Sequence, residues 1–229
     1  MRFTMHKLMG AAILMAASHV AAAASFSCST AHTEQEKLIC ADEESSSLDS
    51  KLATLYELAI DLIKGDALKA EQRKWISGTR TQCKEIGCIR SSYRSRIHSI
   101  ENELSRDAVS LDEPIAGELD SPCSPDTGNR FEISMGPGDA HGAISGTIEG
   151  WSECGNKVWD AAALDGRRVG NVAEVKFNGG WDEEDWYEAF VVAYDSKIHW
   201  RVVPHDAKSQ VYVPFAVDVP LSQFHTPPH

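Results

Sequence analysis

The chain has 229 residues, with 22 Lys and Arg against 34 Asp and Glu, and a formal net charge of −12. This excess of acid argues against binding to nucleic acid or to anionic membranes, whose phosphates repel a negative surface. The length is sufficient for one large or two small domains.

The first 24 residues have the pattern of a secretory signal. Basic Arg2 and Lys7 precede an apolar stretch, residues 8–20, which is too short for a comfortable membrane span. Residues 22–24, all alanine, provide a small-residue cleavage site. We therefore expect cleavage before Ser25 and a periplasmic or secreted protein with no stable membrane insertion afterwards. The alternative, an uncleaved anchor, is disfavoured by the shortness of the apolar stretch.

Charge is distributed unevenly over the rest of the chain. Residues 25–106 hold 13 acids and 12 bases, whereas residues 107–229 hold 21 acids and 8 bases. The two halves therefore differ in character, and we expect them to form separate domains.

Residues 25–106 show the spacing of four helices. Thr33, with Glu36 three residues later, predicts the start of a short first helix that ends near Glu43. Gly65 ends the second helix and Gly87 interrupts the chain before the fourth. The apolar residues that recur at helical spacing in the last three helices are Leu48, Leu52, Leu55, Ala59, Leu62, Leu68, Trp75, Ile76, Ile89, Tyr93, Ile97, Ile100 and Leu104. We expect those of the second helix to form a buried seam, and Trp75 to lie in the core on the seam face.

Four of the six cysteines lie in this helical half. An antiparallel hairpin of the second and third helices, turning at Gly65, would return Cys83 to Cys40 and leave Cys28 for Cys88. We favour this pairing, although four cysteines allow two others and the sequence alone does not fix the choice.

The remaining cysteines, Cys123 and Cys154, are expected to bridge within the second half, which gives three disulfides in an oxidising compartment. A zinc site is the weaker interpretation of the cysteines. Their spacings are not those of CxxC knuckles, and no His stands beside them at ligand spacing.

Motifs spread over residues 25–104 together resemble a known family. They are Ser25-Phe26-x-Cys28, Ala31, Glu36, Ile39-Cys40, Leu48-Asp49, Tyr56, Gln72-x-x-Trp75, Arg80 before Cys83, Cys88-Ile89 and Tyr93-x-x-Arg96-Ile97. Each motif alone is weak, but the combination is similar to the N-terminal domain of the LprI-like lysozyme-inhibitor family. Ser45 departs from the pattern, which usually has an apolar residue there. The resemblance implies an exported, disulfide-bonded helical domain and a protein that inhibits lysozyme.

From residue 107 the pattern changes to turns and strands. Residues 107–129 predict a linker with an irregular entry, and residues 221–229 predict a disordered tail. Between them, the strand candidates are 131–135, 142–151, 157–164, 172–177, 187–194, 197–203 and 211–219. Asp195-Ser196 predicts a two-residue hairpin turn. The expected fold class is α+β: a disulfide-stapled four-helix domain (25–106), then an acidic antiparallel β-sandwich or small β-barrel (130–220).

One segment of the β-rich half, residues 179–188, combines five acids with three aromatic residues after two glycines. Acids would steer a basic protein toward this loop, and aromatic side chains would anchor it. The candidate partner-binding residues are Trp181, Asp182, Glu183, Glu184, Asp185, Trp186 and Tyr187. The competing interpretation is an acidic hairpin turn whose aromatic residues point inward. A calcium loop is disfavoured because the run lacks the Asp/Asn alternation and central Gly of an EF-hand.

Catalytic motifs are missing from the sequence. It contains no nucleophile elbow, HExxH motif, P-loop or dinucleotide fingerprint. The histidines of the second half, His141, His199, His205, His225 and His229, do not define a site. We therefore expect no enzyme activity, no metal and no cofactor.

The leading hypothesis is an exported lysozyme-inhibitor-like protein that occludes a basic muramidase without catalysis. It rests on the family resemblance and on the acidity of residues 107–229. The expected partner is lysozyme or another basic protein that acts on the envelope. The alternative is a structural or stress-response module that binds another envelope protein or a glycan. An unrecognised hydrolase would require polar residues that converge in a pocket of the β-rich half.

Overall fold

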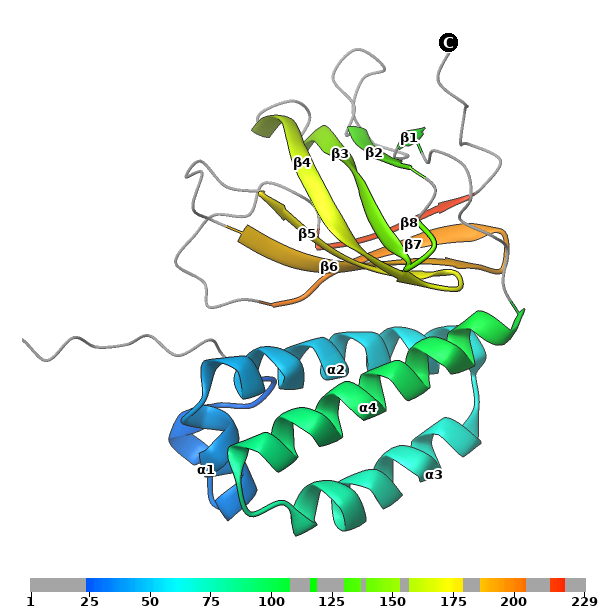
Figure 1. Ribbon diagram of the computed structural model, residues 1–229. Coiled ribbons are helices and arrows are strands. Elements are labelled where there is room, and N and C mark those ends of the chain that lie inside the picture. The colour runs from blue at the N-terminus through cyan, green and yellow to red at the C-terminus, as the bar shows by residue number, and fades with distance from the viewer. Residues whose placement is uncertain are drawn as a thin grey trace, which may run out of the picture.

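The protein consists of a layer of helices beneath a curled β-sheet (Figure 1). The computed structural model describes residues 24–107, 116–118, 130–136, 139–152, 157–178, 186–204 and 215–220. The expectations for the signal segment before residue 24, for Cys123–Cys154 and for the tail lie outside the described residues. The predicted α+β class is confirmed.

The helical layer contains the four predicted helices, α1 (Glu34–Cys40), α2 (Glu43–Ile63), α3 (Asp66–Trp75) and α4 (Ile86–Leu104). Thr33 and Glu36 form the predicted capping box. Helix α2 begins at Glu43, where the first helix was expected to end, because Asp42 is its N-cap. The Asp42 carboxylate accepts a hydrogen bond from the Ser45 amide. A π-helical turn, η2 (Ile76–Arg80), follows α3.

The predicted pairing of the N-terminal cysteines, Cys40–Cys83 and Cys28–Cys88, is wrong. The disulfides are Cys28–Cys40 and Cys83–Cys88, so each closes a local segment. Helix α1 does lie close to Cys83, because the Gln35 side chain donates to the Cys83 carbonyl at 2.8 Å. Cys40 is five residues beyond Gln35 and points about 140° away around the helix, toward Cys28.

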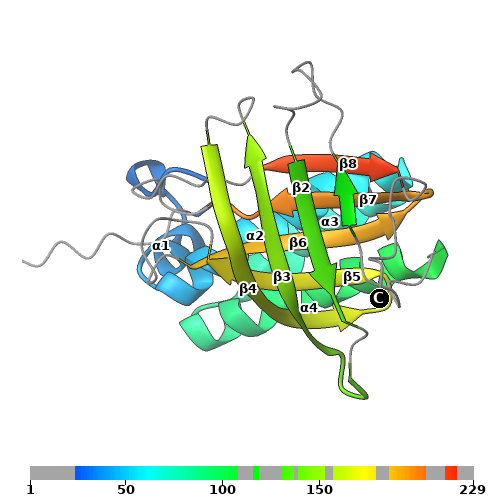
Figure 2. The same ribbon diagram turned by 90° about the horizontal axis from the view of Figure 1, so that it is seen from above.

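The second half forms one antiparallel sheet with strand order β1-β2-β3-β4-β5-β6-β7-β8. The strands are β1 (Ala116–Glu118), β2 (Arg130–Met135), β3 (Ala143–Ser152), β4 (Lys157–Val169), β5 (Val172–Asn178), β6 (Trp186–Tyr194), β7 (Lys197–Val202) and β8 (Ala216–Pro220). The sheet curls so that β2–β4 cross over β5–β8, as a half-barrel (Figure 2). The predicted hairpin at Asp195-Ser196 is confirmed, with both residues at positive φ.

Glycines in two neighbouring strands permit this curl. A Cβ at Gly146 would lie 1.8 Å from the Ser134 carbonyl oxygen, and one at Gly166 would lie 2.1 Å from the Glu174 carbonyl oxygen. Only residues without a side chain fit such close approaches of strand to strand.

Strand β6 is buried on both faces of the sheet. Along β6, Tyr187, Ala189 and Val191 point into the curl and join one hydrophobic cluster. Phe190 and Val192 alternate with them and join the core of the helical layer. The helices and the sheet therefore pack face to face through a shared core.

The β4–β5 turn fixes the sheet against the end of α4. Ser105 follows α4, and its hydroxyl oxygen lies 2.9 Å from the Val169 carbonyl oxygen and 2.8 Å from the Glu101 carbonyl oxygen. Gly170, at φ +60°, brings the turn close to Ser105, where a Cβ would lie 2.4 Å from the hydroxyl oxygen. This contact sets how the sheet sits on the helices.

Candidate functional site

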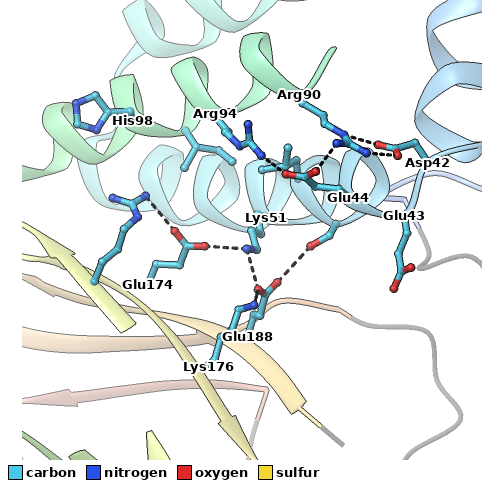
Figure 3. A pocket seen from close by; sticks show the side chains of 14 residues that line it. Asp42, Glu43, Glu44, Lys51, Arg90, Arg94, His98, Glu174, Lys176 and Glu188 are labelled. Atoms are coloured by element: carbon cyan, nitrogen blue, oxygen red, sulfur yellow. Dashed lines mark hydrogen bonds and ion pairs between the residues drawn. The ribbon is translucent and has the colours of Figure 1, made fainter. Parts of the chain in front are cut away.

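A cleft of about 870 Å³ lies between the helical layer and the sheet (Figure 3). It is bounded by α2 and α4 on one side and by β4, β5 and β6 on the other. Its lining residues are Asp42, Glu43, Glu44, Ser47, Leu48, Lys51, Arg90, Arg94, Ile97, His98, Arg167, Glu174, Lys176 and Glu188. Acidic and basic side chains are thus mixed along its walls.

Lys51 of α2 joins the two layers. Its Nζ lies 2.8 Å from Glu174 Oε1 on β5 and 2.8 Å from Glu188 Oε1 on β6, and the Lys51 side chain is only 12% exposed. Burial acts to lower the pKa of Lys51, but the two carboxylates outweigh it, so the pKa is raised above its ordinary value. The lysine is therefore held as a cation between helix and sheet.

Arg167 of β4 extends this ion-pair network to α4. Its guanidinium lies 2.7 Å from Glu101 Oε1 and 3.0 Å from Glu174 Oε2. Burial would raise the pKa of Glu174, but the charges of Lys51 and Arg167 outweigh it and lower the pKa. Glu101 is 1% exposed, so this ion pair joins a buried side chain of α4 to the half-exposed Arg167 of β4.

A second group of ion pairs lies within the helical layer at the start of α2. The Arg90 guanidinium donates to both Asp42 oxygens and pairs with Glu44, and Arg94 also pairs with Glu44. The Arg90 hydrogen bonds hold the pKa of Asp42 well below its usual range. In this group each acid pairs with an arginine. Glu43 is exposed at the rim of the cleft, and Figure 3 draws no ion pair to it.

The contacts that the structure shows in the cleft are mostly ion pairs. Its cations and carboxylates neutralise one another and tie α2 and α4 to the sheet. Within the described residues, no group of three or more His, Cys, Asp or Glu side chains could hold a metal ion. Ion pairs in the cleft therefore connect the helical layer to the sheet, and Glu43 at its rim presents a negative charge to solvent.

The predicted partner-binding segment is described only at its end. Trp181, Asp182, Glu183, Glu184 and Asp185 lie outside the described residues. Trp186 begins β6 and is 46% exposed. Tyr187 is 3% exposed and packs on Phe177, with ring centroids 5.8 Å apart. The inward-pointing interpretation therefore holds for Tyr187, which stabilises the sheet, while Trp186 is left at the surface.

The described histidines lie on separate elements. His199 is buried on β7, with Nδ1 2.8 Å from Asp218 Oδ1, and Asp218 also pairs with Arg201. His141 is exposed in the turn between β2 and β3. His205, His225 and His229 lie outside the described residues.

Sequence reasoning missed the Lys51–Glu174–Glu188 cluster. A signal for part of it was available, because Glu174 and Lys176 are charged residues at alternate positions of an otherwise apolar strand. Their partner on α2 carried no comparable signal, since nothing in the sequence relates Lys51 to β5 or β6.

Comparison with known proteins gives one match. The family model described as "Lysozyme inhibitor LprI" matches residues 27–108, a range that contains all four helices and both described disulfides. No curated protein and no solved structure matches the chain. In the part of the chain that the structure describes, no helix is both long and apolar enough to cross a membrane. The match confirms the predicted resemblance: residues 27–108 are similar to the lysozyme inhibitor LprI family.

Proposed function

We propose that this protein is an exported inhibitor that binds a basic lysozyme-type muramidase and blocks its cleft without catalysis. The observation that carries the proposal is the match of residues 27–108 to the lysozyme inhibitor LprI family. Those residues form the disulfide-stapled helical layer, and the sheet packs on it through a common core. A rigid, covalently stapled scaffold suits an inhibitor because little conformational entropy is lost on binding.

Two features support export to the periplasm or the exterior. The Cys28–Cys40 and Cys83–Cys88 disulfides are stable in oxidising compartments and rare in the cytosol. The alanines at 22–24 would serve as the cleavage site of a signal that precedes them. Both are compatible with the envelope, where a muramidase acts.

The surface that we propose for the partner lies at the rim of the interlayer cleft. The Ser47 hydroxyl donates to Glu188 Oε2 at 3.2 Å, which joins the start of α2 to the start of β6. Glu43 lies one helical turn before Ser47, and Trp186 lies two residues before Glu188 on the same face of its strand. An exposed acid and an exposed indole thus flank the Ser47–Glu188 contact. In the sequence, Trp181 and the acidic run 182–185 directly precede Trp186.

This combination suits a basic partner. Acidic side chains speed encounter with a cationic protein and lose that effect as salt screens them. A Trp that becomes buried on binding is a common source of binding energy at interfaces. The proposed contact residues are therefore Glu43, Trp186 and the segment 181–185, while buried Tyr187 acts inside the sheet.

The test is inhibition of a purified basic lysozyme that is degrading peptidoglycan. Residues 25–229, purified in the oxidised form, are titrated into the reaction at low and at physiological salt. We expect inhibition at micromolar concentration or below, stronger at low salt. A periplasmic pull-down that captures an envelope protein or glycan, with no effect on lysozyme, would support the structural-module alternative instead.

A further inference from the structure

The backbone nitrogen of Ser25 contacts a buried carboxylate. Ser25 N donates to Asp49 Oδ2 at 2.8 Å, and the Ser25 hydroxyl donates to the same oxygen at 2.6 Å. Asp49 lies in α2 and is 6% exposed. Its other oxygen, Oδ1, accepts a hydrogen bond from the Tyr93 hydroxyl at 2.7 Å. Ser25 is therefore bonded to an acid inside the helical layer.

In the unprocessed chain, the Asp49 carboxylate accepts hydrogen bonds from neutral protein groups. Among the residues that the structure describes, its donors are one amide and two hydroxyls. The Arg80 guanidinium donates to the Tyr93 hydroxyl oxygen at 3.5 Å, and Tyr93 in turn donates to Asp49. A buried carboxylate is costly without a cation beside it. In the described part of the chain, no cationic side chain pairs directly with this carboxylate.

Cleavage at the bond expected from the sequence would supply that group. Hydrolysis adds water across the Ala24–Ser25 peptide: the C–N bond breaks, the new carboxylate leaves on Ala24, and the freed nitrogen of Ser25 takes up protons as an ammonium. The atom that becomes the ammonium is the one that already lies 2.8 Å from Asp49 Oδ2. We propose that Ala24–Ser25 is the processing site and that the α-ammonium of Ser25 is the counter-ion of Asp49.

The local structure holds the new terminus in place. Phe26 packs against the core of the helical layer, and Cys28, three residues after Ser25, is bonded to Cys40 at the end of α1. So short a tether keeps the amine near Asp49 at high effective concentration. The Cys28–Cys40 disulfide thus anchors the chain three residues after the amine.

The burial of Ala24 indicates that signal cleavage comes before this segment docks onto the helices. Ala24 is 8% exposed in the folded chain, and the amide that follows it is bonded to Asp49. A peptidase needs an accessible, extended substrate, so cleavage precedes the docking of this segment. Processing then both releases the protein from its signal and completes the charge balance of the helical layer.

The first test examines the terminus itself. Protein exported by a bacterial host is analysed by intact mass and by N-terminal labelling with an amine-reactive ester near pH 7. We expect a chain that begins at Ser25 and whose α-amine reacts at least about tenfold more slowly in the native than in the unfolded protein. A chain that begins at another residue, or an α-amine that reacts equally fast in both states, would overturn the proposal.

The second test is a double-mutant cycle. Chains that begin at Ser25 or at Ala23 are compared with Asp49 intact and with Asp49→Asn, and Glu57→Gln on the exposed side of α2 is the control background. With Asp49 intact, the two extra alanines should raise the unfolding equilibrium constant about ten- to hundredfold, the range for a hydrogen bond to a charged group. In the Asp49→Asn background the effect should fall to about threefold or less.

The pH dependence gives an independent readout of the same ion pair. The groups around the amine are Asp49 of α2, Tyr93 of α4 and Arg80 of η2, and burial raises the pKa of Tyr93, which stays neutral. An ammonium paired with a carboxylate titrates above the free amine, whose pKa is about 8. The advantage of the Ser25 chain should therefore be complete below about pH 7 and decline above about pH 8. Equal effects with Asp49 intact and with Asp49→Asn, or an advantage independent of pH, would contradict the proposal.

Discussion

Lys51 Nζ lies 2.8 Å from Glu188 Oε1, so a residue of the second helix and a residue of the sixth strand form an ion pair across the two layers of the protein. The pair joins the half that matches the lysozyme inhibitor LprI family to the half that has no family match. It lies in the same cleft whose rim carries Glu43, next to the start of β6 at Trp186. The stability of the protein and the position of its proposed contact surface thus depend on the same elements.

Replacing Lys51 with Met should destabilise the protein by about 3 kcal/mol. Glu174 and Glu188 would remain largely buried without their shared cation, and removing one partner of a buried ion pair costs far more than the pair contributes. The matched control is Lys69→Met, because Lys69 pairs with a fully exposed Asp66. That change should stay within about 0.5 kcal/mol. Urea unfolding measures both variants, and equal effects would contradict the role of Lys51.

The same cluster predicts a loss of stability in acid. The pKa of Glu174 is lowered in the folded protein, below the ordinary value of 4.5. Ionised Glu174 therefore stabilises the fold fully above pH 4.5, and this contribution is lost as the pH falls through the lowered pKa. The free energy of unfolding, measured between about pH 3 and about pH 7, should decrease as the pH falls below the ordinary pKa of Glu174. In Lys51→Met the decline should be shallower, and an unchanged slope would argue against this coupling.

The disulfide connectivity is open to a direct chemical check. Peptide mapping without reduction should give linked peptides for Cys28–Cys40 and for Cys83–Cys88. Replacing each pair with Ser should cost about 3 and about 2 kcal/mol respectively, in the order of the loop sizes. A peptide that links Cys40 to Cys83 would show that the connectivity described above is wrong.

Trp186→Ala should weaken inhibition of lysozyme about tenfold or more and leave the unfolding midpoint nearly unchanged. The reason is that its indole is 46% exposed in the free protein and would become buried only on binding. Ile76→Ala is the control, since Ile76 is a similarly exposed apolar residue on η2, away from the cleft. Loss of inhibition with Ile76→Ala and not with Trp186→Ala would place the contact elsewhere on the helical layer.

Local sequence signals predicted the elements well. The seam through Leu48, Leu52 and Leu55 identified α2 because its spacing matches one face of a helix. Asp195-Ser196 identified a hairpin because two polar residues separate two strand-like runs, and both take the positive φ of such a turn. In each case the determining interactions lie within a few residues of one another.

The packing of these elements against one another was harder to predict from the sequence. Which way Cys40 points around α1 depends on the rotation of that helix against its neighbours, and no periodic pattern encodes it. One feature of the sequence indicates that helices cover the sheet. Residues 189–193 of β6 form an uninterrupted apolar run, which indicates a strand buried on both faces. The partners of Lys51 lie more than a hundred residues away, so the cleft follows only from the docked layers.

The central claim is that this protein inhibits a basic muramidase by binding it. The most direct measurement is the rate of peptidoglycan hydrolysis by a purified basic lysozyme, titrated with residues 25–229 at two salt concentrations. We predict saturable inhibition at micromolar concentration or below, with an inhibition constant that rises with salt because the acidic rim contributes to encounter. Full lysozyme activity at a large excess of the oxidised, folded protein, in both salts, would contradict the claim.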